Sequence, residues 1–280
     1  MRATSIILAA ACVVACCATL SAKQLDSCLP RAQHPWGRFK IGSWKTVVTA
    51  TETLDERGEV IGRDFTETTT KLVDVDDRGY TLRVDVAVIV AGKRFRGEPQ
   101  VIRRGFSGEC DGQTVSVKRV GQGRLAIAGR DIPCEIRQVT IDDVGSKRIT
   151  TVHYSDRYAP YVLRRETTAL DVQGNPLELQ SQVDVMAVDE LKVVQKVMRP
   201  TSRVRIMHQQ GKASTLTLEV HCADVPGGVI EHTSKETDDT GRVIRRSTLE
   251  LVTFQVGTGE DADSQLVRKA FHRARNRRAR

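Results

Sequence analysis

The sequence predicts an all-β protein, a meander of long antiparallel strands that forms a curved sheet or incomplete barrel. Three observations lead to this prediction: the tetrapeptide Asp-x-x-Gly recurs along the chain, several segments alternate apolar and polar residues, and helical patterns are few. Asp suits the first corner of a type I turn because its carboxylate accepts backbone N–H groups, and Gly suits the fourth because it tolerates positive φ. Such turns between alternating runs are typical of hairpins. Five copies begin at Asp55, Asp76, Asp142, Asp171 and Asp238.

Residues 1–22 have the pattern of a secretory signal peptide. Arg2 supplies a positive charge, Ile6–Ala15 is an apolar stretch of ten residues, and small residues follow it. The stretch is short for a membrane span, so we expect an exported chain, either periplasmic or secreted. Two alternatives stay open. One is an uncleaved anchor over residues 5–22, and the other is a lipoprotein in which Cys16, preceded by Val-Val-Ala, carries the lipid.

Cysteine usage fits an oxidising compartment. Three of the seven cysteines lie in the signal segment, and the mature chain keeps Cys28, Cys110, Cys134 and Cys222. Four cysteines allow two disulfides in three connectivities, and the alternative is buried free thiols. Cys134 and Cys222 alternate in phase with apolar neighbours, so both are expected to face the apolar side of the sheet. No Cys-x-x-Cys occurs, which argues against a zinc ribbon or a thioredoxin-type site.

The mature chain divides into three parts. Residues 23–42 contain two prolines and little periodicity, which indicates an irregular N-terminal lead. Residues 43–257 carry the strand patterns and form the predicted antiparallel β domain. A strand, Pro-turn and hairpin pattern recurs at an offset of 66 to 67 residues, which favours two repeated sub-units at about 43–145 and 146–257. Residues 258–280 form a basic C-terminal helix or tail.

Several predicted strands have one apolar face. Tyr80–Val90 alternates most regularly, and Leu177–Ala187 and the segment around Leu218 follow the same pattern. Threonine-rich strands near residues 46–53 and 66–70 fit a half-solvated sheet. One-sided strands are typical of antiparallel sheets, because parallel sheets are covered on both faces. The residues expected to line one apolar groove are Leu82, Val84, Val86, Val88, Leu177, Leu179, Val183, Val185, Leu216 and Leu218.

Helical patterns are limited to two segments. Val188–Met198 fits either a helix or an edge strand, and Asp263–Arg280 places apolar residues at helical spacing after an acidic start. The tail also holds most of the net charge of +8, because seven of its last thirteen residues are basic and the folded body is near neutral. We therefore expect the tail to contact an anionic membrane or envelope polymer, and we do not expect nucleic-acid binding. The basic residues are Arg268, Lys269, Arg273, Arg275, Arg277, Arg278 and Arg280.

A sheet with one apolar face must bury that face, and this chain has almost no helix to cover it. The sheet must curl on itself, pair with a second sheet or hold an apolar guest. In this pattern, from Trp44 to about Val256, the chain resembles the periplasmic lipoprotein carriers of the LolA-like type. No diagnostic motif of those carriers is matched, so no family residue is transferred. The resemblance implies a groove for acyl chains or another hydrophobic ligand.

No constellation of catalytic residues stands out. Gly-x-Ser-x-Gly is absent, and Gly121–Ala126 matches the short dinucleotide pattern without the helix that should follow it. His221 and Cys222 are adjacent on a strand and should face opposite sides, which argues against a shared metal ion. We predict no catalytic residue, no cofactor and no metal. The first hypothesis is an exported, non-enzymatic carrier of a hydrophobic, lipid-like ligand, and the alternative is a structural or interaction module of the cell envelope.

Overall fold

The computed structural model describes residues 24–25, 27–90 and 93–259. The signal segment with Cys16, and the tail with its predicted helix, lie outside these residues, so both stay predictions. The described chain holds a 3-10 turn, η1 (Arg31–Gln33), and fifteen strands. These are β1 (Gln24–Leu25), β2 (Trp44–Leu54), β3 (Val60–Val75), β4 (Gly79–Val90), β5 (Lys93–Arg96), β6 (Gln100–Gly105), β7 (Thr114–Ile127), β8 (Arg130–Asp143), β9 (Ser146–Tyr154), β10 (Val162–Asp171), β11 (Pro176–Val194), β12 (Val197–Gln210), β13 (Ala213–His221), β14 (Val229–Thr237) and β15 (Val243–Gln255).

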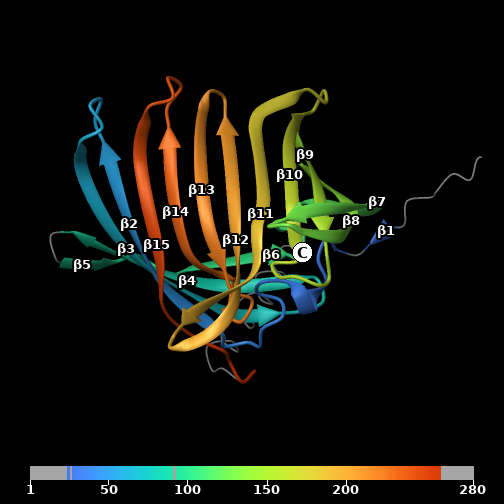
Figure 1. Ribbon diagram of the computed structural model, residues 1–280, viewed down its shortest axis with the longest axis horizontal. Coiled ribbons are helices and arrows are strands. Elements are labelled where there is room, and N and C mark those ends of the chain that lie inside the picture. Colours follow the sequence, from blue (N-terminus) through green and yellow to red (C-terminus); the bar gives the residue numbers. More distant parts are fainter. Residues whose placement is uncertain (1–23, 26, 91–92, 260–280) are drawn as a thin grey trace, which may run out of the picture.

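All fifteen strands belong to one open, curved antiparallel sheet, which confirms the predicted fold class. The order is β1-β7-β8-β9-β10-β11-β12-β13-β14-β15-β2-β3-β4-β5, and β6 also pairs with β4. β2 and β9–β15 stand as a tall curved wall in Figure 1, and β4, β6, β7 and β8 cross in front of it. Within the described chain, no helical segment is long and apolar enough for a membrane crossing.

Five Asp-x-x-Gly tetrapeptides form hairpin turns, as predicted. They connect β2 to β3, β3 to β4, β8 to β9, β10 to β11 and β14 to β15. Asp171 illustrates the chemistry, because its carboxylate accepts the backbone N–H groups of Gln173 and Asn175 at 2.9 and 2.8 Å. Gly174 closes the turn with φ of 86°, a value that favours glycine. The ambiguous segment Val188–Met198 is the end of β11, a two-residue turn and the start of β12, so the helical alternative is wrong.

The core is divided into four small apolar clusters. The first lies where the end of the β7–β8 hairpin packs over β10–β12, with Ile127 and Ile132 against Val183 and Val185. The second joins β7, β8 and β9, the third joins β11, β14 and β15, and the fourth joins β3 and β4 to the N-terminal lead. The sheet therefore buries its apolar residues locally, at its curled end and beneath the lead.

The N-terminal lead packs against one end of the sheet, at β3 and β4. Trp36 and Phe39 pack against the fully buried Leu72 of β3. Buried Ser43 links the lead to the far end of the chain, because its Oγ donates to the Lys40 carbonyl at 2.6 Å and accepts the Gly257 N–H at 2.9 Å. The ends of the predicted β domain, residues 43 and 257, therefore lie side by side.

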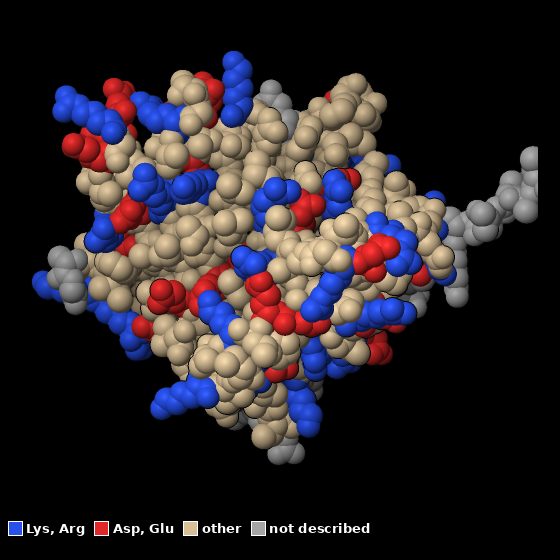
Figure 2. All heavy atoms as spheres, viewed as in Figure 1, with Lys and Arg blue, Asp and Glu red and all other residues tan. Residues whose placement is uncertain are grey.

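Charged side chains of both signs are interleaved over the view in Figure 2. Several ion pairs join neighbouring strands, as in Arg205–Asp184 at 2.9 Å and Arg245–Glu236 at 3.1 Å. This mixture fits a body with little net charge, and exposed pairs of this kind contribute at most about 1 kcal/mol each.

Candidate functional site

The strand register defines one inner face. Residues directly opposite each other in an antiparallel sheet point to the same side. Starting at Val185 of β11, one such row crosses eight strands and ends at Val88 of β4. Val185 is buried under the β7–β8 hairpin, so the whole row lies on the concave side. Its members in strand order are Val185, Val204, Glu219, His232, Leu249, Thr49, Thr66 and Val88.

Most of the predicted groove residues share this inner face. By alternation from Val88 and Val185, they are Leu82, Val84, Val86, Val88, Leu177, Val183 and Val185. The side chain of Leu179 lies outside those that the structure describes. Leu216 and Leu218 are a correction, because Thr217 pairs with Ile206 on the inner face and the two leucines therefore point outward. They are 37% and 53% exposed, so the apolar side of β13 is its solvent side.

The centre of the inner face is more polar than predicted. From β13 to β3 it carries mainly Thr, Ser, His and Glu residues, such as Thr217, Ser247 and Thr68. In β15 the inner residues Ser247 and Leu249 are half-buried, whereas the outward residues Arg246 and Thr248 are exposed. The inner face therefore combines a polar floor with apolar residues on β4 and β11.

Glu219 is the centre of a charged cluster on this floor. Its carboxylate lies 2.6 Å from Nε2 of His221 on the same strand. Burial raises the pKa of Glu219, but the His221 hydrogen bond and the charges of His221, His232 and Lys45 outweigh burial, so the pKa lies below its usual value. Burial also lowers the pKa of His232, against the effect of Glu219.

Lys45 of β2 reaches the same cluster. Its Nζ donates to the Val229 carbonyl at 2.8 Å. Burial lowers the Lys45 pKa to about 8, and the Glu219 carboxylate partly offsets this effect. A lysine with this pKa is partly uncharged near neutral pH and matches a general base in principle. The Ser247 hydroxyl lies 3.4 Å from Nε2 of His232 in the same cluster.

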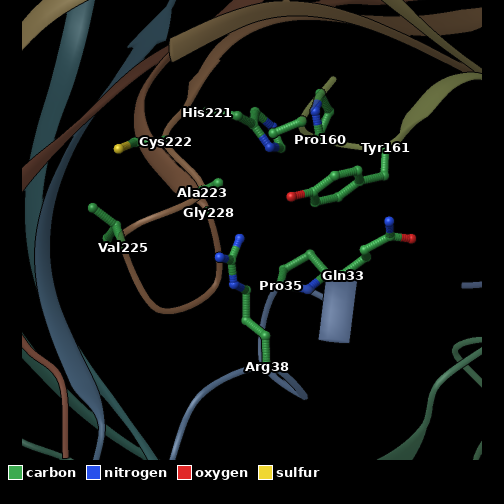
Figure 3. Close-up of a pocket in the computed structure, with 11 residues that line it drawn as sticks. Gln33, Pro35, Arg38, Pro160, Tyr161, His221, Cys222, Ala223, Val225 and Gly228 are labelled. Atoms are coloured by element: carbon green, nitrogen blue, oxygen red, sulfur yellow. The ribbon is translucent and has the colours of Figure 1, made fainter. Parts of the chain in front are cut away.

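A small pocket opens beside this cluster, where three segments meet (Figure 3). It holds about 320 Å³ of empty space, part of it open to solvent. The Tyr161 hydroxyl and the Arg38 guanidinium point into it, and His221 lies at its rim. Tyr161 has φ of 68°, a left-handed backbone that is uncommon for an aromatic residue. The pocket is lined by Gln33, Pro35, Arg38, Ala159, Pro160, Tyr161, His221, Cys222, Ala223, Val225 and Gly228.

Arg137 ties the lead to β8 at the other side of the inner face. Its guanidinium donates to the Cys28 carbonyl at 2.6 Å and to Glu135 at 2.6 Å, and it lies 3.8 Å from the centroid of the Tyr154 ring. The Tyr154 hydroxyl in turn donates to Gln33 at 2.5 Å. These contacts hold the lead against β8 and β9.

The four mature cysteines are free thiols in the structure. Cys134 and Cys222 are 5% and 0% exposed, whereas Cys28 and Cys110 are half-buried. Burial raises the pKa of Cys28, Cys134 and Cys222, so these thiols stay protonated near neutral pH. Whether any pair forms a disulfide after export stays a prediction.

No metal site takes shape in the described residues. They contain no group of three His, Cys, Asp or Glu side chains placed to hold a metal ion. His153 points outward beside Cys134, at 3.7 Å between Nδ1 and Sγ. Ser155 is buried and accepts the Arg157 N–H at 3.5 Å, so it makes no contact with an imidazole.

The sequence analysis missed the charged residues of the inner face. Lys45, Glu219, His232 and Arg165 all lie in phase with inner-face residues of their strands. For Lys45, the available signal was that this charged residue alternates in phase with the apolar residue Val47. Alternation alone does not identify the concave face, so this signal could not be interpreted before the register was known.

No known protein-family model matches the chain, and no curated protein sequence matches it. Three solved structures show a distant likeness. A presumed exported protein with a YmcC-like fold from Bacteroides fragilis is 9% identical with a TM-score of 0.32, over 78% of this chain and 98% of that chain. A presumed lipoprotein from Parabacteroides distasonis is 10% identical with a TM-score of 0.30, over 78% and 98%. A DUF1329 family protein from Desulfovibrio piger is 9% identical with a TM-score of 0.32, over 79% and 88%. Likeness at this level carries no conclusion about this chain.

Proposed function

We propose that the chain is an exported, non-enzymatic β protein that binds a hydrophobic, lipid-like ligand on the concave face of its sheet. The observation that supports this proposal is the state of the apolar residues on β4. Val84 and Val86 are half-buried and Val88 is 37% exposed, and none of them belongs to the four core clusters. They face inward on a sheet that has no helix over them within the described chain.

Apolar side chains that face water on the inside of a curved sheet are unfavourable in free energy. A bound ligand that covers them removes this contact with water. Burying apolar area contributes about 25 cal/mol per Å². The polar floor from β13 to β3 supplies hydroxyl and imidazole groups for the polar end of the same ligand. An amphipathic molecule therefore fits the face better than a purely apolar one. Export to the envelope accounts for the signal segment, and the basic tail would contact anionic surfaces there.

Displacement of a fluorescent fatty-acid probe tests this proposal. We expect saturable uptake by the exported chain and at least a tenfold loss of affinity in Val86→Asp, which places a charge on the inner face. Leu218→Asp is the control on the outer face, where Leu218 is 53% exposed, whereas Val86 is half-buried on the inner face. Val84→Thr provides a milder inner-face change if Val86→Asp unfolds.

Two outcomes would contradict the carrier. Absence of saturable uptake by the unmodified chain would favour the structural or interaction module. Equal losses of probe affinity in Val86→Asp and Leu218→Asp, with circular dichroism spectra that match the unmodified chain, would show that the probe does not bind on the inner face.

A further inference from the structure

Four arginines lie on the inner face at the β7–β10 side of the sheet. Arg119, Arg137 and Arg165 belong to one row, with Val152 of β9 between Arg137 and Arg165. The row continues to Val183, which is buried on the concave side. Arg148 of β9 lies four residues from Val152 and therefore shares this face. This side of the concave face is thus rich in guanidinium groups.

Two of these arginines are satisfied by a single carboxylate. Glu135 lies 3.0 Å from Arg119 and 2.6 Å from Arg137, and Arg137 also has the Cys28 carbonyl and the Tyr154 ring. Arg165 and Arg148 differ, because within the described residues neither makes a hydrogen bond or an ion pair. Cys28 and Glu219 act on Arg165, and Asp143 interacts with Arg148, only through their charges and without a hydrogen bond or an ion pair.

Arg165 is enclosed by protein but remains accessible. Burial lowers its pKa, Cys28 and Glu219 oppose this effect, and the like charge of Arg148 lowers the pKa further. The residue nevertheless counts among the exposed ones, as expected for a side chain that lines the inside of an open sheet. Two neighbouring cations without a counterion in such a place are unfavourable, and an anion between them would remove the cost.

Two hydroxyl groups lie next to the arginine pair. Thr150 and Thr167 are directly opposite each other on β9 and β10, and their Oγ1 atoms are 3.0 Å apart. Each lies two residues from one of the arginines, Thr167 from Arg165 and Thr150 from Arg148, so all four side chains share the inner face. Guanidinium forks with adjacent hydroxyls are the donors that suit a phosphate group.

We propose that Arg165, Arg148, Thr150 and Thr167 form an anion-binding subsite that takes the phosphate headgroup of the ligand. The amphiphile part of this inference rests on the proposed function, whereas the phosphate site itself rests on the four side chains. The subsite would explain why two arginines without a hydrogen-bonded counterion lie side by side on this part of the inner face. It also narrows the ligand class from lipid-like molecules in general to anionic amphiphiles.

Isothermal titration of the exported chain with three probes tests the subsite. The probes are dodecyl phosphate, dodecyl maltoside with an uncharged headgroup, and inorganic phosphate. We expect dodecyl phosphate to bind more tightly than dodecyl maltoside, and the double variant Arg165→Gln/Arg148→Gln to lose at least tenfold in affinity for dodecyl phosphate only. Arg164→Gln is the matched control, because Arg164 neighbours Arg165 on β10 but pairs with Glu166 on the outer face at 2.5 Å.

The outcomes separate the two proposals. If inorganic phosphate binds through Arg165 while neither dodecyl probe binds more tightly than phosphate, the subsite stands and the lipid carrier fails. If both dodecyl probes bind and the double variant, folded by circular dichroism, binds dodecyl phosphate unchanged, the subsite fails and the carrier stands. Arg165→Lys, which keeps the charge without the fork, should show an intermediate loss and also serves if the double variant does not fold.

Discussion

At the scale of single residues, buried polar groups determine how the chain responds to its surroundings. His34 in the lead is 9% exposed, and its Nδ1 accepts the N–H groups of Trp36 and Gly37 at 3.2 and 3.0 Å. Its ring also lies 4.8 Å from that of Tyr80 and 5.2 Å from that of Phe106, measured between centroids. A protonated ring would lose the Nδ1 acceptor and place a charge among aromatic groups. Burial accordingly lowers the His34 pKa from 6.5 to about 4.

The first prediction concerns stability against pH. Between about pH 6.5 and 4 the unfolded chain binds a proton at His34 that the folded chain does not bind, so the free energy of unfolding falls as the pH drops through this window. The shift corresponds to about 3 kcal/mol. His34→Asn keeps an acceptor near the Nδ1 position and cannot titrate, so urea unfolding of this variant should lose that part of the pH dependence. An unchanged difference in unfolding free energy between pH 7 and pH 4 would contradict this role of His34.

Residue-scale features of the site were only partly predictable. Cys222 is buried although Leu216 and Leu218, with which it is in phase, point to solvent, because it lies beyond the end of β13 at His221. The inner charges Lys45 and Arg165 could not be predicted, because alternation divides a strand into two faces without stating which face is concave. Leu216 and Leu218 were misplaced for the same reason.

At the scale of elements, the N-terminal lead is held by backbone and side-chain contacts at the pocket end of the sheet. The Gly227 N–H donates to the Pro35 carbonyl at 2.9 Å, and the Trp36 ring lies against the Gly227 Cα. A Cβ at Gly227 would stand 2.8 Å from the Trp36 ring, whereas a Cβ at Gly174 would meet no atom within 4 Å. Both glycines have positive φ, at 78° and 86°.

This pair gives the second prediction. Gly174→Ala should cost about 1 kcal/mol from backbone strain alone. Gly227→Ala should cost about 1–3 kcal/mol more, because the buried Trp36 ring must also move. Urea midpoints at constant m-value measure both costs, and tryptophan fluorescence reports whether the lead has shifted. Equal costs at the two positions would show that the lead does not dock as described.

Local patterns predicted the strands well but not their long-range pairing. The predicted strand Tyr80–Val90 matches β4, and Leu177–Ala187 lies within β11. The β15–β2 pairing joins residues about two hundred positions apart in the sequence, as in Gln255 opposite Trp44. Nothing in the alternation of either strand encodes that partner, since any strand with an apolar face could have taken the place.

At the scale of the whole molecule, the sheet is closed by none of its edges. The first and last strands of the order, β1 and β5, are short, and β7 and β4 are the outermost long strands. The core is distributed over four clusters, which agrees with a chain that has only two Trp, four Tyr and six Phe. A sheet of this kind keeps an inner surface that its own side chains do not fill, and this surface is where the ligand is proposed to lie.

The basic tail gives a third prediction at this scale. Truncation before Ser264 removes all seven basic residues of the last thirteen and should abolish binding to vesicles with anionic lipids, while uptake of the fatty-acid probe stays unchanged. Binding of the full chain should also weaken as salt is raised, because the attraction is electrostatic. Vesicle sedimentation measures both effects, and unchanged binding after truncation would remove this role from the tail.

Native mass spectrometry of the mature chain, purified after export without detergent, is the most direct test of the carrier. We expect a non-covalently bound anionic amphiphile that leaves under denaturing conditions, with occupancy reduced in Val86→Asp and retained in Leu218→Asp. A chain that carries no such mass from its own compartment, and takes up none when dodecyl phosphate is added, would contradict ligand binding on the concave face.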